Sequence, residues 1–279
     1  MFEVTLPKVG DRIVEMAFKT SQKVDAGDQS PKIVVRYRVA RIPKSKGKYR
    51  NIYIPDNATK RLLRSYIPVL EEKLKSLDGS KVNYAFVKGK NPVLNALQHI
   101  GYNYTLTLDL KDFFDSIKVK QIEGILDDSL IKDCLIEGAP RQGFPTSPLI
   151  ASLAFMKVDE QIISALEKLS LELTYTRYAD DLIFSFNERR DGVKILFTVQ
   201  QIIERNGYQL NRKKTRLQCV RNGRIVITGI AVDQNGLYPT RRTKKKLRAA
   251  LHQGNLAAAR GLNEWAKCKL PNELVKLHG

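Results

Sequence analysis

One stretch, residues 174–186 (TYTRYADDLIFSF), constrains this chain more than any other, because two adjacent carboxylates interrupt two runs rich in apolar and aromatic residues. On both sides of the acidic pair, large side chains recur at every second position, which is the pattern of β-strands. The stretch therefore predicts a short hairpin with Asp180 and Asp181 at its bend.

The acidic pair also limits what can surround it. Two like charges at one bend repel each other and are costly to bury, so either a cation neutralises them or the pair is exposed. Hard divalent cations bind proteins through carboxylate oxygens, and we therefore interpret Asp180 and Asp181 as a metal-binding platform. The alternative is an ordinary solvated turn, because Asp suits turn positions.

A third acid, Asp109, stands 71 residues before Asp180 (180 − 109), at the expected end of a strand that begins at Tyr104. An acid at the end of an apolar strand is costly unless it is bound or exposed. If this strand lies beside the hairpin, Asp109 adds a third carboxylate to the same site. Asp109 and Asp180 bridging two ions would give the two-metal clamp of phosphoryl transfer.

The excess of positive charge is concentrated in two parts of the chain. The 279 residues include 48 Lys and Arg against 29 Asp and Glu, a net charge of +19. Residues 32–64 hold eleven basic residues and one acid, and residues 240–279 hold ten basic residues and two acids. Such an excess indicates a polyanionic partner, nucleic acid or an anionic membrane. The alternative is two solvated basic faces without a ligand.

Composition narrows the class of protein further. A chain of 279 residues with 43% hydrophobic residues can form one large domain or two modest ones. Cys134, Cys219 and Cys268 lie far apart, so neither a structural zinc site nor a disulfide framework is expected, and a reducing cytoplasm is the simplest location. Residues 1–19 contain no long apolar run, so neither a signal peptide nor a membrane span is expected there.

Periodicity and capping signals place the remaining elements. Strands are expected over residues 33–42 and from Arg50, joined by a turn rich in Lys and Gly, and a helix capped by Asp56 and kinked at Pro68 is expected over residues 56–77. Further helices are expected over residues 16–24, 119–136, 149–169 and 193–206, and two more begin at residues 91 and 241. A further strand is expected over residues 225–232.

Several polar and aromatic residues allow two interpretations. The basic hairpin could bind triphosphate or could simply be solvated; the candidates are Lys44, Lys46, Lys48 and Arg50, with Arg50 favoured for its bidentate fork. Asn95 and His99 share a helix face, where His99 could equally be a hydrogen-bonded core histidine. Gln142 stands in a loop rich in Gly and Pro that could approach a substrate or only connect two elements.

The order of these motifs resembles that of reverse transcriptases. The segments LDLKDFFDSI, RQGFPTSP, YADD and GYQLNRKKT resemble the successive motifs A to D, and IPKSKGKYRNIYIP resembles the first finger motif. The resemblance covers about residues 36–250. Within the family, NALQH at residues 95–99 fits the NAxxH pattern of the bacterial retron branch, and ITG at 227–229 stands where retrons carry VTG.

The resemblance implies an α+β fold of the right-hand polymerase type, with fingers, a palm with an antiparallel sheet, and a short helical thumb. It assigns residues 1–100 to an N-terminal segment and the fingers, and residues 101–239 to the palm, with a fingers insertion at about 119–170. Residues 240–279 would form the basic thumb.

The resemblance also implies site residues. Asp109, Asp180, Asp181 and the Leu110 carbonyl would hold two Mg2+ ions, and Lys214 would act as a general acid. The expected dNTP-binding residues are Lys48, Arg50, Gln142 and Phe114, whose ring would exclude a 2′-OH; core packing is the alternative for Phe114. The expected RNA-binding residues are Asn95, His99, Arg241, Arg242, Lys244, Lys245, Lys246 and Arg248.

The activity that the resemblance implies is RNA-directed DNA synthesis. The enzyme would copy part of its own structured non-coding RNA (msr-msd) into branched single-stranded DNA and, with a separate effector protein, guard bacteria against phage. Two alternatives stay open: a defence-linked reverse transcriptase without a dedicated template, and a non-catalytic RNA-binding scaffold. Intact Asp109, Asp180 and Asp181 argue against the scaffold, which has no reason to retain clustered acids.

Overall fold

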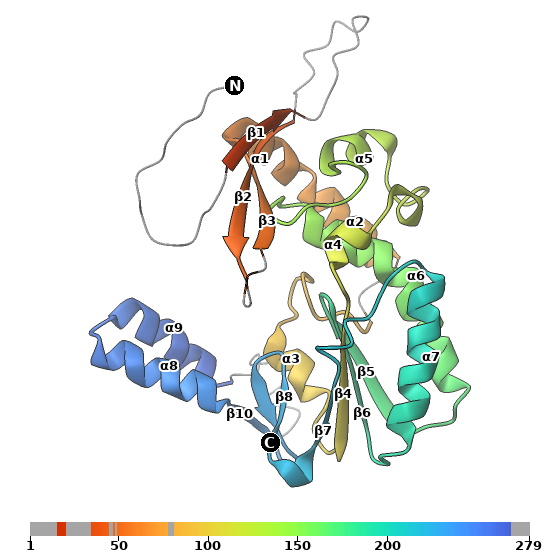
Figure 1. Cartoon of the computed structure of the whole chain (residues 1–279), viewed down its shortest axis with the longest axis vertical. Helices are drawn as coiled ribbons and strands as arrows, with labels where there is room; N and C mark the ends of the chain where they lie inside the picture. Colours follow the sequence, from red (N-terminus) through yellow and green to blue (C-terminus); the bar gives the residue numbers. More distant parts are fainter. Residues whose placement is uncertain (1–15, 21–34, 45–46, 48, 78–80, 269–279) are drawn as a thin grey trace, which may run out of the picture. The chain divides into compact units, whose positions relative to one another are not determined.

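The chain divides into two compact units, each of which is built from two separate stretches of sequence. The structure is a computed structural model that describes residues 16–20, 35–44, 47, 49–77 and 81–268. The first unit comprises Met1–Leu74 and Phe114–Ala154, and the second comprises Lys75–Phe113 and Phe155–Gly279. Figure 1 shows the order of the elements along the chain.

The first unit contains a three-stranded antiparallel sheet of β1 (Met16–Thr20), β2 (Arg36–Pro43) and β3 (Tyr49–Pro55), in that order. The strands expected on both sides of the basic turn are confirmed. The helix expected over residues 16–24 is wrong for residues 16–20, which pair with β2, while residues 21–24 lie outside the described residues. Backbone pairing with a neighbouring strand outweighs a weak local helical pattern.

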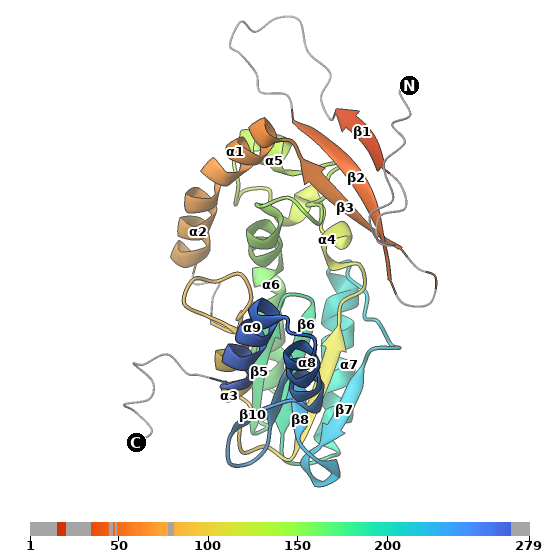
Figure 2. The ribbon, with the colours of Figure 1, turned by 90° about the vertical axis from the view of Figure 1, so that its left-hand side faces the viewer.

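Two short helices follow the sheet, α1 (Asn57–Ser65) and α2 (Ile67–Ser76). As expected, Asp56 caps α1, and its Oδ1 accepts a hydrogen bond of 2.7 Å from the Thr59 N–H. A kink was expected at Pro68, but the helix is interrupted instead: α1 ends before Tyr66 and α2 begins after it (Figure 2). Pro68 falls in the first turn of α2, where its missing N–H removes no helical hydrogen bond.

The segment from residue 113 to residue 167 contains four elements. They are α4 (Phe113–Ser116), the 3-10 turn η2 (Val119–Gln121), α5 (Asp128–Cys134) and α6 (Ser147–Glu167). The long helix expected over residues 149–169 is confirmed as α6. The continuous helix expected over residues 119–136 is wrong, because Gly124 has a φ of +76° and interrupts the segment. Such a φ is readily adopted by glycine and cannot continue a right-handed helix.

The second unit contains a four-stranded antiparallel sheet in the order β5 (Leu173–Tyr178), β6 (Asp181–Phe186), β4 (Tyr104–Asp109) and β7 (Arg216–Cys219). The helix α7 (Asp191–Arg205) packs against β6, and a Cβ added to Gly192 would lie 2.9 Å from the Phe186 ring. The central strands β4 and β6 are largely buried, which fixes their register.

A smaller sheet of β8 (Ile225–Ile227), β9 (Ile230–Val232) and β10 (Leu237–Pro239) packs on α3 (Pro92–Leu97) in the same unit. The single strand expected over residues 225–232 is wrong. The chain reverses at Thr228 and Gly229, whose φ values of +46° and +84° are typical of a type I′ hairpin turn.

The described part of the chain ends in two helices, α8 (Arg241–His252) and α9 (Leu256–Ala266), which pack on each other. Thr240 caps α8 and Asn255 caps α9 through their side-chain oxygens. Across the residues that the structure describes, no helix combines the length and the apolar character that a membrane span requires.

Candidate active site

The Asp180–Asp181 pair lies at the bend of the β5–β6 hairpin, as its sequence predicts. Tyr178 pairs with Asp181, which leaves Ala179 and Asp180 as the two central residues of the turn. Ala179 has a φ of +56°, and a positive φ at the first central residue is a feature of the type II′ turns that join twisted strands. The tight turn places Asp181 at the start of β6 and Asp180 immediately before it, rather than along a solvated loop.

Asp109 lies directly opposite Asp181. The two residues are register partners at the end of the β4–β6 pairing, and the Leu110 N–H donates a hydrogen bond of 2.9 Å to the Asp180 carbonyl. Side chains that are directly opposite on antiparallel strands have Cβ atoms about 5 Å apart. The structure thus brings together three acids from two distant parts of the sequence, as expected from the end of the Tyr104–Asp109 strand.

The three acids influence one another electrostatically. The pKa of Asp181 is raised to about 6, first by burial and then by the charges of Asp180 and Asp109, against the opposing effect of Lys214 and Arg216. Asp109 is only 5% exposed. The negative charge of this cluster is therefore incompletely compensated by protein groups, and a bound cation would relieve it.

Lys214 supplies part of the compensation. Its Nζ lies 2.6 Å from Asp109 Oδ2, and this hydrogen bond is the main cause of the raised pKa of Lys214. The loop that carries Lys214 is bonded to the end of β4, because the Asn211 N–H donates to the Asp109 carbonyl at 2.8 Å. The sequence-predicted lysine therefore contacts the sequence-predicted acid.

The donor chemistry of the cluster fits divalent cations. Within the described residues, no group of three His, Cys, Asp or Glu side chains is arranged as a formed metal site. The acids of the cluster nevertheless offer carboxylate oxygens, the ligands that hard divalent cations prefer, on two adjoining strand ends. The Lys214 ammonium is paired with one of these carboxylates, that of Asp109. A metal cation bound by Asp109 would compete with Lys214 for this carboxylate.

A buried ion pair joins the β5–β6 hairpin to α6, and it was not predicted from the sequence. Arg177 on β5 is fully buried, and its Nη2 and Nε lie 2.8 and 2.9 Å from Asp159 Oδ2 on α6. The Tyr175 hydroxyl donates to Asp159 Oδ1 at 2.6 Å. The available signal was a basic residue at an inward position of an apolar strand and an acid within an apolar helix.

His99 and Asn95 are interior residues. His99 is 2% exposed, with Nδ1 2.9 Å from Ser185 Oγ and Nε2 2.7 Å from Thr176 Oγ1, and Asn95 is fully buried. Burial lowers the pKa of His99 to about 3, so the ring is neutral near pH 7. This burial argues against the expected direct contact with RNA and favours the alternative interpretation, a hydrogen-bonded core histidine.

The expected nucleotide-binding residues belong to the first unit, whereas the acids belong to the second. Arg50 is exposed on β3, and Lys48 lies outside the described residues. Phe114 is half-buried on α4, and the Gln142 carbonyl accepts a hydrogen bond of 2.8 Å from the Tyr53 N–H. Their roles stay predictions.

The expected basic residues of α8 are all exposed. Its buried residues, Thr243 and Ala250, mark the side of the helix that packs inward. The exposed basic residues are Arg241, Arg242, Lys244, Lys245, Lys246 and Arg248. Their positions allow contact with phosphates, and their role also stays a prediction.

Comparison with known proteins gives these features a context. The family model described as "Reverse transcriptase (RNA-dependent DNA polymerase)" matches residues 42–247, more than half of the chain. The retron Ec86 reverse transcriptase of Escherichia coli is 33% identical over 228 residues, covering 78% of this chain and 69% of that protein. The retron Mx65 reverse transcriptase of Myxococcus xanthus is 30% identical over 251 residues, covering 80% of this chain.

The chain spans 57% of the length of the Mx65 relative. Among solved structures, telomerase from Candida albicans, in complex with a fragment of telomeric RNA, aligns with a TM-score of 0.57 at 12% identity over 72% of this chain and 46% of its own. That likeness confirms the expected polymerase fold of mixed helices and antiparallel sheet. Fold, motif order and sequence identity agree, and the chain belongs to the reverse transcriptase family, in its retron-type branch.

Proposed function

We propose that this protein is an RNA-directed DNA polymerase of a bacterial retron that uses two Mg2+ ions. The observation that carries the proposal is the register of β4 and β6, which sets Asp109 opposite Asp181 with Lys214 on Asp109. Membership of the reverse transcriptase family supports the reaction class, nucleotidyl transfer from dNTPs onto a primer hydroxyl.

In this proposal, Asp109, Asp180 and Asp181, with the Leu110 carbonyl, hold the ions. Bound Mg2+ would lower the pKa of the primer hydroxyl and neutralise charge on the departing pyrophosphate. Lys214 keeps a proton at Nζ, since its hydrogen bond to Asp109 raises its pKa, and it delivers that proton to the leaving group as a general acid.

Substrate recognition falls to residues of the first unit. Lys48 and Arg50 bind the triphosphate, and Gln142 approaches the nucleotide from its loop. The Phe114 ring lies under the sugar and excludes a 2′-OH, so that dNTPs are preferred over NTPs.

The template is proposed to be a structured non-coding RNA (msr-msd) of the retron, part of which is copied into branched single-stranded DNA. The exposed basic residues of α8 contact its phosphates. Action in the cytoplasm, together with a separate effector protein and in defence against phage, completes the proposal, which here depends on likeness to retron reverse transcriptases.

Primer extension tests the chemistry. With poly(rA)/oligo(dT), dTTP and Mg2+, we expect the native protein to extend the primer and Asp180→Asn to abolish extension while RNA binding, measured by fluorescence anisotropy, is retained. Glu188→Gln, an exposed acid just beyond β6, serves as the matched control and should extend normally. Extension by Asp180→Asn at the native rate would show that the assignment of the acids is wrong.

Two further measurements separate the alternatives. Product whose sequence follows a supplied RNA supports a templated polymerase, and product independent of that RNA supports a defence-linked enzyme without a dedicated template. RNA binding without any incorporation supports a scaffold. Sequencing of nucleic acid that co-purifies with the protein should return a short RNA–DNA hybrid, sensitive to both RNase and DNase, if the retron assignment holds.

A further inference from the structure

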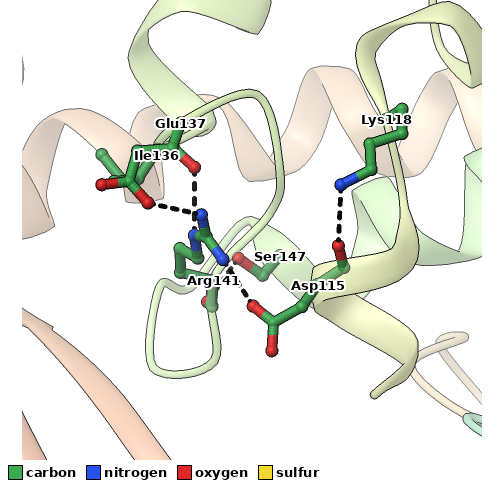
Figure 3. Close-up of polar contacts among 6 residues, drawn as sticks. All are labelled: Asp115, Lys118, Ile136, Glu137, Arg141 and Ser147. Atoms are coloured by element: carbon green, nitrogen blue, oxygen red, sulfur yellow. Dashed lines mark hydrogen bonds and ion pairs between the residues drawn. The ribbon is translucent and has the colours of Figure 1, made fainter. Parts of the chain in front are cut away.

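Arg141 is the centre of a polar network in the first unit (Figure 3). Its Nη1 lies 2.6 Å from Asp115 Oδ1, its Nη2 lies 2.9 Å from Glu137 Oε2, and its Nε donates to the Ile136 carbonyl at 3.0 Å. The Arg141 side chain is 13% exposed, although those of Asp115 and Glu137 are 59% and 70% exposed. All three guanidinium nitrogens therefore have acceptors: two surface carboxylates for Nη1 and Nη2, and a main-chain carbonyl for Nε.

The backbone around Arg141 is fixed as well. Its carbonyl accepts a hydrogen bond of 2.7 Å from the Ser147 hydroxyl at the start of α6. The next carbonyl, that of Gln142, accepts the Tyr53 N–H of β3 at 2.8 Å. Gly143 then passes so close to β3 that an added Cβ would lie 2.3 Å from the Tyr53 carbonyl. The loop is thus attached to α6 and β3 by its main chain.

The side chain of Arg141 adds the attachment that the main chain lacks. Asp115 directly follows Phe114 on α4, and its ion pair with Arg141 joins that short helix to the loop of Gln142. A helix of four residues has little intrinsic stability, so its orientation depends on such external contacts. The ion pair thus links the residue next to Phe114 on α4 to the residue next to Gln142 in the loop.

We propose that Arg141 is a positioning residue for sugar selection, which acts through Asp115 to set the place of the Phe114 ring. The inference rests on the proposed function, in which Phe114 and Gln142 contact the incoming nucleotide. Exclusion of a single hydroxyl by a ring depends on placement within a fraction of an ångström, so a loosened α4 admits ribonucleotides before it impairs bond formation.

The chemistry of the network requires arginine. A planar guanidinium presents donors in a fixed fork and can meet Asp115, Glu137 and the Ile136 carbonyl at once. A lysine at the same position keeps the charge but has a single nitrogen on a flexible stem, and it cannot meet three acceptors that lie on different sides. Arg141→Lys therefore tests geometry with charge held constant.

The experiment measures kcat and KM for dTTP and for UTP by primer extension on poly(rA)/oligo(dT), with the full chain and Mg2+. For Arg141→Lys and Asp115→Asn we expect the preference for dTTP over UTP to fall by about 10-fold, with kcat for dTTP changed by less than about 3-fold. Asp115→Glu keeps the carboxylate and should recover most of the preference. Asp127→Asn, another exposed acid of this unit, should behave as the native protein.

The possible results separate the inference from the proposed function. Native activity with an unchanged dTTP preference in Arg141→Lys and Asp115→Asn would overturn the inference and leave the polymerase assignment intact. An equal loss of kcat for both nucleotides would also overturn it, because that loss reports general support of the fold. A native protein that incorporates neither nucleotide refutes the proposed function, and the inference with it.

Discussion

The Lys214 ammonium is hydrogen-bonded to the Asp109 carboxylate across 105 positions of sequence. The same loop is bonded a second time, from the Asn211 N–H to the Asp109 carbonyl. The end of β4 and the loop are therefore joined by one side-chain and one main-chain hydrogen bond. A charge that neutralises one acid of the cluster is thus built into the second unit.

The first prediction separates the charge of Lys214 from its proton. Lys214→Ala should lower kcat for dNTP incorporation by about 10²-fold, the smallest effect typical of a lost general acid. Lys214→Arg should keep a positive charge beside Asp109 and yet be nearly as slow as Lys214→Ala, because a guanidinium does not release its proton. Single-turnover incorporation measures both, with Lys213→Ala as the exposed control. Native rates in Lys214→Arg would contradict the role of acid.

The second prediction concerns the buried pair of Arg177 and Asp159. Asp159→Asn leaves a buried guanidinium without its counter-charge and should lower the free energy of unfolding by about 3–5 kcal/mol. The double variant Asp159→Leu/Arg177→Met removes both charges and leaves only the Tyr175 hydroxyl without its acceptor. It should be less destabilised than the single variant, because an unpaired buried hydroxyl costs less than an unpaired buried charge. Urea unfolding followed by circular dichroism measures both. A double variant with a lower free energy of unfolding than Asp159→Asn would refute this account.

The third prediction is a dependence of stability on pH through His99. Burial lowers the pKa of the folded-state ring to about 3, below its ordinary value of 6.5, so the unfolded state binds more protons between these values. Stability from this residue is therefore complete above pH 6.5 and falls as the pH drops, by roughly 1.4 kcal/mol per pH unit at most.

The check is urea unfolding of the native protein and of His99→Gln between pH 4 and 7, compared as a difference at each pH. The raised pKa of Asp181 acts with the opposite sign, and the difference cancels it because both proteins keep Asp181. His252→Gln, an exposed histidine, should leave the native slope unchanged. A difference between the two proteins that stays constant from pH 4 to 7 would mean that His99 does not cause the effect.

The fourth prediction compares two glycines of the first unit. Gly143 and Gly124 both have positive φ, +111° and +76°, but only the Cβ of an alanine at 143 would meet backbone, at 2.3 Å from the Tyr53 carbonyl. Gly124→Ala should cost about 1 kcal/mol from backbone strain alone, and Gly143→Ala clearly more. Thermal unfolding measures the two. Equal losses would mean that the loop can move away from β3 freely.

The fifth prediction tests α8 as a binding surface for phosphates. Removal of one basic side chain that binds a phosphate should make the slope of log affinity against log salt shallower by about 0.7–0.9. The triple variant Lys244→Gln/Lys245→Gln/Arg248→Gln should therefore bind RNA more weakly at low salt and with a smaller salt dependence. Lys168→Gln, an exposed basic residue outside α8, is the control. An unchanged slope would place the RNA away from this helix.

The acids of the site could be predicted from sequence because each stands where an apolar period of two is broken. Asp109 ends one such run and Asp180–Asp181 separates two others, so the strands and the bend were readable locally. The helix cap at Asp56 and the helix start at Asn91 were also readable locally, since a capping side chain acts within three residues of itself.

Other features depend on distant contacts, which local patterns do not report. Residues 16–20 form a strand because β2 pairs with them. The run IVITGIAV reads as one strand until Thr228 and Gly229 adopt positive φ. Asp115 lies 26 residues before Arg141, on α4, and Glu137 lies four residues before it in the non-helical connection between α5 and α6, so neither contact follows from a helix or strand period.

The opposition of Asp109 and Asp181 has a consequence for how sequences of this kind can diverge in length. Neighbouring residues of a strand face opposite sides of the sheet, so gaining or losing one residue within β4 or β6 would turn an acid toward the interior and bring an apolar side chain to the site. Insertions and deletions should therefore be absent from these two strands in active variants. They should be tolerated in exposed turns such as residues 221–223.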